Sequence, residues 1–348
     1  MTVSSRAARQ GTPPVVEFLP LSADDDETVG QWLALLAEPW ENAPRSAPPC
    51  NVDLVGSLRF APPATALDDW VARQDGTVVG SLRLALPQGA PSARIDQLLV
   101  HPRSRRRGVG RALWDHARAR AREHGRRTLT ATVVESLPDG PGLDPAPAAF
   151  AAAVGAVRSG GSAGLHQWLD LRRHNPLADG VPAPPPGYSL VTWGTITPDE
   201  YAVQVSALEL SLGDTPSDAA DAEVRSSYAR KFETMRVGRG RRAYHTGVVH
   251  ERSGRLAGYT SVSKTAGHPE FALQGMTVVH RDHRGHGLGR ILKLANLDHV
   301  LRHEPAVRLV ETANDETNDA MIAVNASLGF ERFERWVTWT AGTAEETA

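Results

Sequence analysis

The chain has 348 residues, which is more than one typical hydrophobic core supports, so the sequence predicts two domains. A net charge of −2 argues against a general nucleic-acid binder, and the single cysteine, Cys50, excludes an intrachain disulfide and a cysteine-based metal site. The sequence has no apolar signal segment and no run of about 18 apolar residues, so we expect a cytoplasmic protein with no membrane segment and no metal.

The first half reads as helix, hairpin, strand, loop, helix and strand. A polar stretch opening at Asp24 to Asp26 predicts a helix with acid at its positive end, and Asp75-Gly76 predicts a hairpin turn. A strand at residues 95–100 leads into an arginine- and glycine-rich loop. The amphipathic helix that follows has apolar residues at Val109, Ala112, Leu113, Ala117 and Ala121 and closes at Gly125. A strand, a short helix and a last strand complete the pattern.

The second half repeats this order, from a helix start at Pro198 to a hairpin turn at Ser253-Gly254 and a helix stripe of Leu288, Ile291, Leu292 and Ala295. Val100 aligns with Val279, and the same offset pairs Gly108 with Gly287. Five prolines lie in residues 174–187, where neither a helix nor a central strand can continue. We therefore predict domains at residues 1–173 and 188–348, joined by a linker at 174–187.

The two glycine loops, which read "HPRSRRRGVG" and "HRDHRGHGLG", each precede a helix. A helix start presents unpaired N–H groups and partial positive charge, and glycine lets the backbone approach a ligand closely. Flanking arginines add charge-assisted contacts. The loops therefore suit a pyrophosphate, although they match neither a Walker loop nor a complete dinucleotide fingerprint.

The pattern V-x-P-x-x-R-x-x-G-x-G of the first half, and V-x-x-x-x-R-x-x-G-x-G of the second, resemble the acetyl-CoA motif of GCN5-related N-acetyltransferases (GNAT). The segment "TANDETNDAMIAVNASLGF" also resembles that family. The resemblance covers nearly the whole chain as a tandem pair. It implies a mixed α/β (α+β) fold of two GNAT domains, each a mostly antiparallel, splayed sheet flanked by helices.

The resemblance also implies that acetyl-CoA, or another acyl-CoA, is the co-substrate, with its pyrophosphate on the loop amides and its pantetheine along the preceding strand. The contacts implied in the second half are Val278, Val279, Arg284, Gly285, His286, Gly287, Leu288, Gly289, Arg290, Asn314 and Asn318. Those implied in the first half are Val100, Arg105, Arg106, Arg107, Gly108, Val109, Gly110 and Arg111.

Acetyl transfer to an amine needs a base, because an alkylammonium of pKa about 10 is less than about 1% neutral at pH 7. Asp96 stands four residues before Val100, where the family often carries its base, but the second half has Gly275 there. We take Glu311 as the second-half candidate, with an exposed strand residue paired to arginine as its alternative. Asp96 has the alternative of a surface or cap carboxylate. His280 recurs as His101, which favours a turn role.

The family's usual acid, a tyrosine four residues before the glycine of "GF", is replaced by Asn325 in the second half and Ala151 in the first. The second half keeps Asn318, Met321, Gly329 and Phe330 of the last motif. The first half has "PDGPGLDPAP" where a helix should begin. We therefore expect the second domain to be catalytic, and the first to be degenerate, regulatory or a scaffold.

The resulting prediction is an acetyl-CoA-dependent N-acetyltransferase of a small-molecule amine in specialised metabolism or resistance, with no nucleic-acid or membrane partner. The alternatives are a non-catalytic CoA-binding or interaction protein, and a transferase of a larger acyl group or to a hydroxyl. The sequence leaves the oligomeric state open. Acidic residues in a segment that covers the substrate in the family would attract a cationic amine, or simply form a solvated loop: Asp214, Asp218, Asp221 and Glu223.

Overall fold

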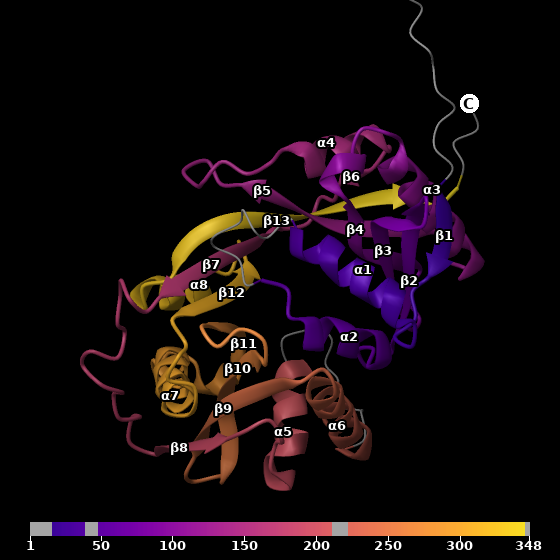
Figure 1. Cartoon of the computed structure of the whole chain (residues 1–348). Coiled ribbons are helices and arrows are strands. Elements are labelled where there is room, and N and C mark those ends of the chain that lie inside the picture. The colour runs from indigo at the N-terminus through magenta and orange to yellow at the C-terminus, as the bar shows by residue number, and fades with distance from the viewer. Residues whose placement is uncertain (1–15, 39–47, 211–221, 345–348) are drawn as a thin grey trace, which may run out of the picture.

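A computed structural model describes residues 16–38, 48–210 and 222–344. In this part of the chain one mixed sheet runs through the whole molecule, with helices on both faces (Figure 1). Its strand order is β1-β2-β3-β4-β5-β13-β7-β12-β11-β10-β9-β8, and the short β6 pairs with β13. Among the described residues, no helix is both long and apolar enough to span a membrane.

The first half contains β1 (Glu17–Pro20), α1 (Asp26–Ala37), α2 (Asn51–Arg59), β2 (Thr65–Gln74), β3 (Thr77–Pro87), β4 (Ser92–Val100), α3 (Val109–Glu123), β5 (Thr128–Ser136), α4 (Ala146–Ala153), β6 (Val157–Arg158) and β7 (Gly164–Asp170). The second contains β8 (Tyr188–Trp193), α5 (Asp199–Leu210), α6 (Ala222–Gly238), β9 (Arg241–His250), β10 (Arg255–Thr265), β11 (Phe271–Val279), α7 (Leu288–His303), β12 (Leu309–Asp315), α8 (Asp319–Ser327) and β13 (Glu331–Gly342).

Local sequence signals account for the predicted elements. The Asp25 carboxylate caps α1 by accepting from the Thr28 N–H at 3.0 Å. Asp75 and Gly76 both have positive φ, 49° and 78°, as a two-residue turn between β2 and β3 needs. A helix also begins within "PDGPGLDPAP", residues 138–147: α4 starts at Ala146, although its N-cap, Pro145, makes no side-chain capping bond.

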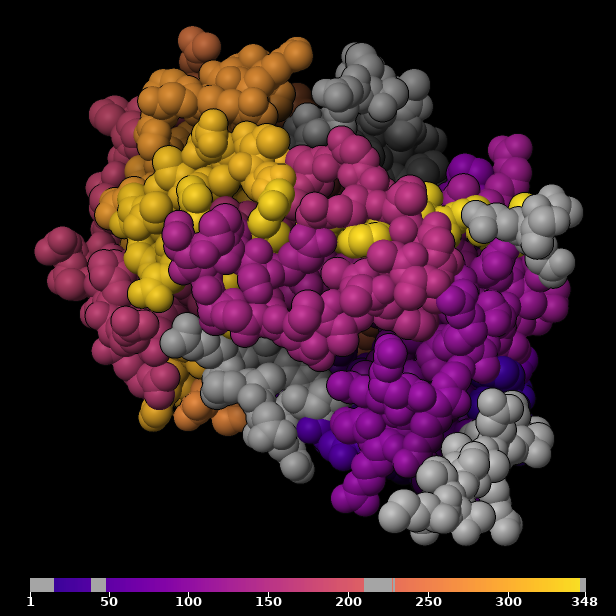
Figure 2. All heavy atoms as spheres, turned by 90° about the horizontal axis from the view of Figure 1, so that it is seen from above, coloured from indigo at the N-terminus to yellow at the C-terminus, as the bar shows by residue number. Residues whose placement is uncertain are grey.

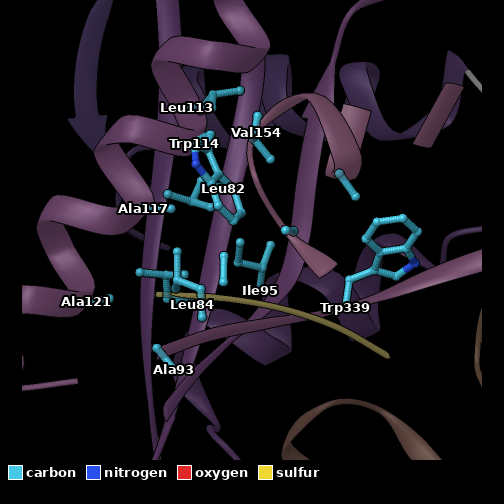
Figure 3. Packing of buried hydrophobic residues seen from close by; sticks show 14 of the residues in the cluster. Leu82, Leu84, Ala93, Ile95, Leu113, Trp114, Ala117, Ala121, Val154 and Trp339 are labelled. Carbon is cyan, nitrogen blue, oxygen red and sulfur yellow. The ribbon is translucent and has the colours of Figure 1, made fainter. Parts of the chain in front are cut away.

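The helix stripes pack against the sheet as predicted. Leu113, Ala117 and Ala121 of α3 are fully buried over one face of the sheet, against Leu82 and Leu84 of β3 (Figure 3). Burying one leucine side chain stabilises the fold by about 1.5–3 kcal/mol. On the opposite face α1 covers the alternate β2 and β3 residues, with Trp32 packed over Val71 and Val78. Each half therefore holds its strand–loop–helix unit on a packed core.

The two halves exchange their last strands. β13, from the end of the chain, pairs with β5 of the first half, and β7 pairs with β12 of the second. In Figure 1 the long yellow β13 crosses into the first half, and in Figure 2 its yellow atoms show between magenta and purple ones. Trp339 of β13 belongs to the first core and Leu169 of β7 to the second, so neither core is complete without the other half.

The predicted division at 1–173, 174–187 and 188–348 stays a prediction. Residues 174–187 form neither helix nor strand. The exchanged strands do not follow that division, because β7 lies before residue 174 in the chain but pairs with β12 of the second half. Of the acidic residues expected to attract an amine, Asp214, Asp218 and Asp221 lie outside the described part of the structure, and Glu223 falls at the start of α6.

Candidate active site

The two glycine loops have the same backbone geometry. Gly108 and Gly287 are the N-caps of α3 and α7, with φ of 87° and 71°. A Cβ at either position would meet nothing within 4 Å, so the space in front of both helix starts is open. In each loop an arginine Nε donates to the carbonyl of the strand's last valine: Arg284 to Val279 at 3.1 Å, and Arg105 to Val100 at 3.2 Å. Both loops therefore fit a pyrophosphate.

Several predicted cofactor contacts are available only through their backbone. The side chains of Val109, Leu288 and Val278 are buried in the cores, so only their main-chain groups can face a ligand. His286 turns its Nδ1 to the Arg284 carbonyl at 3.0 Å. Gly285 has φ 82°, whereas the equivalent Arg106 adopts φ 62°, which is strained for a non-glycine residue. The second loop therefore adopts this conformation with less strain.

The remaining predicted loop residues are arginines and glycines that line the helix starts. Arg107 directly precedes Gly108, and Arg111 and Arg290 directly follow Gly110 and Gly289. Arg111 also donates to the carbonyl of Ala153, the last residue of α4. The His280 Nδ1 accepts from the Asp282 N–H at 3.4 Å, and the His101 Nδ1 accepts from the Arg103 N–H at 3.2 Å. The predicted turn role of this repeated histidine is confirmed.

The strand before each loop diverges from its parallel neighbour. β11 pairs with β12 only from Phe271 to Leu273, and β4 pairs with β5 only from Ser92 to Ile95. Beyond these points β11 and β4 continue toward the loops with one backbone edge turned to the gap. An extended chain with amide groups, such as pantetheine, can add to that edge by main-chain hydrogen bonds.

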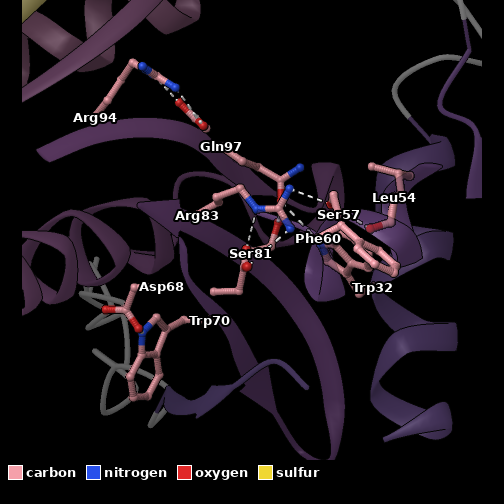
Figure 4. A network of polar contacts seen from close by, with 12 residues as sticks. Trp32, Leu54, Ser57, Phe60, Asp68, Trp70, Ser81, Arg83, Arg94 and Gln97 are labelled. Carbon is pink, nitrogen blue, oxygen red and sulfur yellow. Dashed lines mark hydrogen bonds and ion pairs between the residues drawn. The ribbon is translucent and has the colours of Figure 1, made fainter. Parts of the chain in front are cut away.

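The two candidate bases occupy different surroundings. Both oxygens of Asp96 are bound by Arg94, at 2.5 Å and 3.2 Å, in the pair drawn at the upper left of Figure 4. At the equivalent Gly275 a Cβ would meet the Ser261 Oγ at 2.6 Å, so a side chain there would require the serine to shift. Glu311 lies on the neighbouring strand, at the last residue pair before β11 and β12 diverge. These contacts favour Glu311 over Asp96.

Glu311 faces a buried histidine rather than an arginine. The His166 Nε2, on the exchanged strand β7, lies 3.4 Å from the Glu311 Oε2, which is an ion-pair contact longer than a good hydrogen bond. The His166 Nδ1 lies 2.9 Å from the Glu334 Oε1 on β13, which also accepts from the Trp336 indole at 2.8 Å. Burial alone would lower the pKa of His166, but the flanking carboxylates raise it to about 9. His166 is therefore an imidazolium at neutral pH, and its positive charge lies against Glu311.

We expect the stabilisation from His166 to depend on pH. Its pKa is about 9 in the fold against an ordinary 6.5, so this stabilisation is complete below pH 6.5 and is lost as the pH rises through 9. The difference in free energy of unfolding between wild type and His166→Gln should therefore shrink by about 3 kcal/mol over that interval, at 1.36 kcal/mol per pKa unit. Denaturant titrations from pH 6 to 9.5 measure it. A difference that does not change with pH would show that His166 is neutral in the fold.

A buried amide network joins the same strand to the second half. The Gln167 Oε1 accepts from the Asn325 Nδ2 at 2.8 Å and from the Asn314 Nδ2 at 3.1 Å. The Lys293 Nζ donates to the Asn325 Oδ1 at 2.6 Å. Asn318, expected to contact the cofactor, caps α8 by accepting from the Met321 N–H at 3.1 Å. His166, Gln167 and Lys293 were not predicted from the sequence, and Lys293 lies outside the predicted apolar stripe of α7.

The splayed strands and the glycine loop before a helix, present twice, define a tandem acetyltransferase fold. The profile of the acetyltransferase (GNAT) family matches residues 32–139 and 209–330. A mycothiol acetyltransferase of Thermomonospora curvata is 33% identical over 267 residues, covering 75% of this chain and 77% of that protein. One of Sanguibacter keddieii is 26% identical over 325 residues, covering 91% and 93%. The chain belongs to the GNAT family and is an acyltransferase.

Solved structures agree with this assignment. A tandem GNAT protein from the clavulanic acid biosynthesis pathway is 73% identical, with a TM-score of 0.91, and the match covers 95% of this chain and 100% of that one. A GCN5-related N-acetyltransferase from Sphaerobacter thermophilus, 15% identical with a TM-score of 0.65 over 95% and 96%, shares the fold. The predicted tandem arrangement of two GNAT domains is thus confirmed.

Proposed function

We propose that the second half transfers the acetyl group of acetyl-CoA to the amine of a small molecule, with Glu311 as the base. The observation that carries this proposal is the difference between the halves at the divergence point. By register the pair Leu273–Glu311 of β11 and β12 corresponds to Arg94–Thr130 of β4 and β5, which diverge one pair later, after Ile95–Ala131. Of these two equivalent positions, only the one on β12 of the second half therefore carries a carboxylate.

Each residue has a defined task in this proposal. The amides and arginines of the second loop bind the cofactor's pyrophosphate, and the β11 backbone N–H near Val279 donates to the carbonyl oxygen as negative charge develops. Glu311 accepts the proton that the amine must lose. Glu311, His166 and Glu334 together carry one net negative charge, which suits a cationic substrate. Acetyl-CoA supplies the activated acyl group.

Relatives support the acceptor class. Two curated relatives are mycothiol acetyltransferases, and the 73% identical structure is of a protein from the clavulanic acid biosynthesis pathway. Both are consistent with a small-molecule acceptor in specialised metabolism. The first half retains a loop of the same geometry but has Thr130 where Glu311 stands, so we assign it a cofactor-holding or scaffold role.

Thiol release from acetyl-CoA tests this function. The purified chain is mixed with acetyl-CoA and a panel of small primary amines, each matched with the alcohol that carries a hydroxyl in place of the amine. We expect release with at least one amine and an acetamide product by mass spectrometry. Release with alcohols alone, or with longer acyl-CoA donors alone, would overturn the N-acetyltransferase assignment, and no release with any pair would favour a CoA-binding role.

Acetyl-CoA should also stabilise the protein, while NAD and ATP should do so much less. A ligand at about 100 times its dissociation constant stabilises the native state by about 2.7 kcal/mol, which corresponds to a rise in melting temperature of about 5 °C or more. NAD and ATP offer a pyrophosphate but no pantetheine for the free edge of β11. Thermal scans with each compound at equal concentration measure this. Equal shifts with all three would contradict a pantetheine site.

A further inference from the structure

Lys293 of α7 is a buried amine with one neutral hydrogen-bond partner. Its side chain lies in the run Leu292 to Ala295 and is 3% exposed. The Nζ donates to the Asn325 Oδ1 at 2.6 Å and lies 5.4 Å from the centre of the Phe330 ring. A buried ammonium is costly unless a charge pairs with it. The fold therefore keeps this amine at a cost that packing alone does not explain.

The surrounding network holds the amide of Asn325 in one orientation. Its nitrogen donates to the Gln167 Oε1, so its oxygen remains for Lys293. Asn314 donates to the same Gln167 oxygen from β12. The lysine is thus aimed by residues of α8 and of the exchanged strand β7, rather than pointing into a loose apolar space.

The amine lies behind the point where β11 and β12 diverge. Lys293 lines a small cavity, with room for about one water, together with Gln274 of β11 and Val310 of β12. Gln274 directly follows Leu273, the last β11 residue paired with Glu311. Consecutive residues of a strand point to opposite faces. On β7, His166 contacts Glu311 on one face and Gln167 contacts Asn325 on the other. Glu311 and Lys293 therefore flank the gap from opposite faces.

The first half shows that the fold does not require this pair. The repeat offset places Trp114 at the position of Lys293, and Ala151 stands at that of Asn325. Both residues belong to the apolar core around α3. An indole and a small methyl side chain thus fill the space that the second half gives to an amine and an amide. Lys293 and Asn325 are therefore present only in the half that also contains Glu311.

We propose that Lys293 Nζ is the group that donates a proton to the CoA sulfur during acetyl transfer in the second half. This inference rests on the proposed function. The acceptor nitrogen bonds to the acetyl carbon, and the C–S bond breaks with its electron pair going to sulfur. The Lys293 Nζ gives its proton to that sulfur and becomes a neutral amine, while Glu311 holds the proton lost by the acceptor. Solvent then restores both groups.

The acidity of Lys293 suits this task. Burial lowers the pKa of Lys293 to about 7, and no charged group among the described residues adds to or offsets that effect. A thiol has a pKa of about 8.5, so transfer from this ammonium to a thiolate is downhill by roughly 30-fold, whereas transfer from a phenol of pKa about 10 would be uphill. The neighbours that face the amine are Asn325, Phe330 and Gln274, none of which titrates near neutral pH. The donor is present below pH 7 and is lost as the pH rises through 7.

Binding of CoA and of desulfo-CoA, which lacks the sulfur, tests the proposal without an acceptor. Titration calorimetry at pH 7 is done in a Gly108→Glu background, so that the second-half site is observed. We expect a preference for CoA of about tenfold, which is about 1.4 kcal/mol, from the contact between the Lys293 amine and the CoA thiol. Lys293→Gln, which keeps a donor for Asn325 but has no proton to give, should remove the preference and leave desulfo-CoA affinity unchanged. An unchanged preference would overturn the proposal.

Lys293→Met gives a second variant, which removes the buried amine but leaves the Asn325 Oδ1 without its donor, so its melting temperature is measured to confirm folding. With an amine substrate, the wild-type kcat should fall as the pH rises above about 7, and this alkaline limb should be absent from both variants. A limb that persists contradicts the role of Lys293. If no amine is acetylated yet the CoA preference depends on Lys293, the proposed function fails and the contact with sulfur stands. If amines are acetylated and the preference for CoA is the same in the Lys293 variants as in wild type, only the proton-donor role of Lys293 fails.

Discussion

Glu311→Gln is expected to lower kcat for acetyl transfer by roughly 100-fold or more at neutral pH, the usual scale for removing a general base. The amide keeps the size and a hydrogen-bond acceptor for His166 but cannot take the amine's proton. Acetyl-CoA affinity should change little, because the loop from Arg284 to Arg290 is untouched. Raising the pH should recover part of the loss, since more of the substrate amine is then already neutral. The pH–rate profile of the purified variant measures both effects.

Asp96→Asn is the matched control in the first half. Its carboxylate is already bound by Arg94, so we expect near wild-type turnover. His166→Gln should lie between the two variants, because it removes the imidazolium that contacts the Glu311 carboxylate. A Glu311→Gln enzyme as fast as wild type from pH 6 to 9 would exclude Glu311 as the base. It would also direct attention back to Asp96 and the first half.

Gly287→Glu is expected to abolish turnover. The residue has φ 71° at the N-cap of α7, and a Cβ there meets nothing in the protein, so the new side chain occupies the space in front of the helix start. A carboxylate in that space repels a pyrophosphate and blocks its approach to the amides. We expect acetyl-CoA affinity at the second half to fall by more than about 100-fold, or about 2.7 kcal/mol. Calorimetry and thiol release measure the two effects.

Gly108→Glu is the natural partner of this variant. Gly108 has φ 87° and the same open surroundings, so both substitutions carry a similar backbone strain of about 1–3 kcal/mol. Gly108→Glu should therefore reduce activity less if the second half is catalytic. Gly287→Asn, which tolerates the left-handed conformation, separates strain from charge and should retain most of the binding. A silent Gly287→Glu together with an inactive, folded Gly108→Glu would place the chemistry in the first half.

Local patterns were enough to predict much of the fold. The hairpin at Asp75-Gly76, the helix stripes of α3 and α7 and the glycine loops depend on residues close together in sequence, and each forms as predicted. The repeat in the sequence then implied two copies of one domain. Glu311 was singled out because Gly275 leaves the second half without a carboxylate at the usual position, and Glu311 lies on the following strand.

The residues around Glu311 could not be found in this way. His166 and Gln167 reach the second half only because β7 crosses into its sheet, and that pairing is a long-range choice with no local signal. Lys293 reads as a surface lysine of an amphipathic helix until the exchanged strand and α8 close over it. The positive φ of Arg106 could not be predicted from the sequence either, because arginine rarely adopts a left-handed backbone conformation. The exchange of strands is therefore the feature that sequence reasoning missed most.

A structure of the protein saturated with a non-transferable acetyl-CoA analogue, in which a methylene group replaces the thioester sulfur, tests the central claim most directly. We expect the analogue's pyrophosphate on the loop from Arg284 to Gly289, and its carbonyl in the gap between β11 and β12 with the Glu311 carboxylate on one face and Lys293 on the other. An analogue whose carbonyl lies only in the first half, beside Asp96, with the second-half gap empty at saturation, would contradict it.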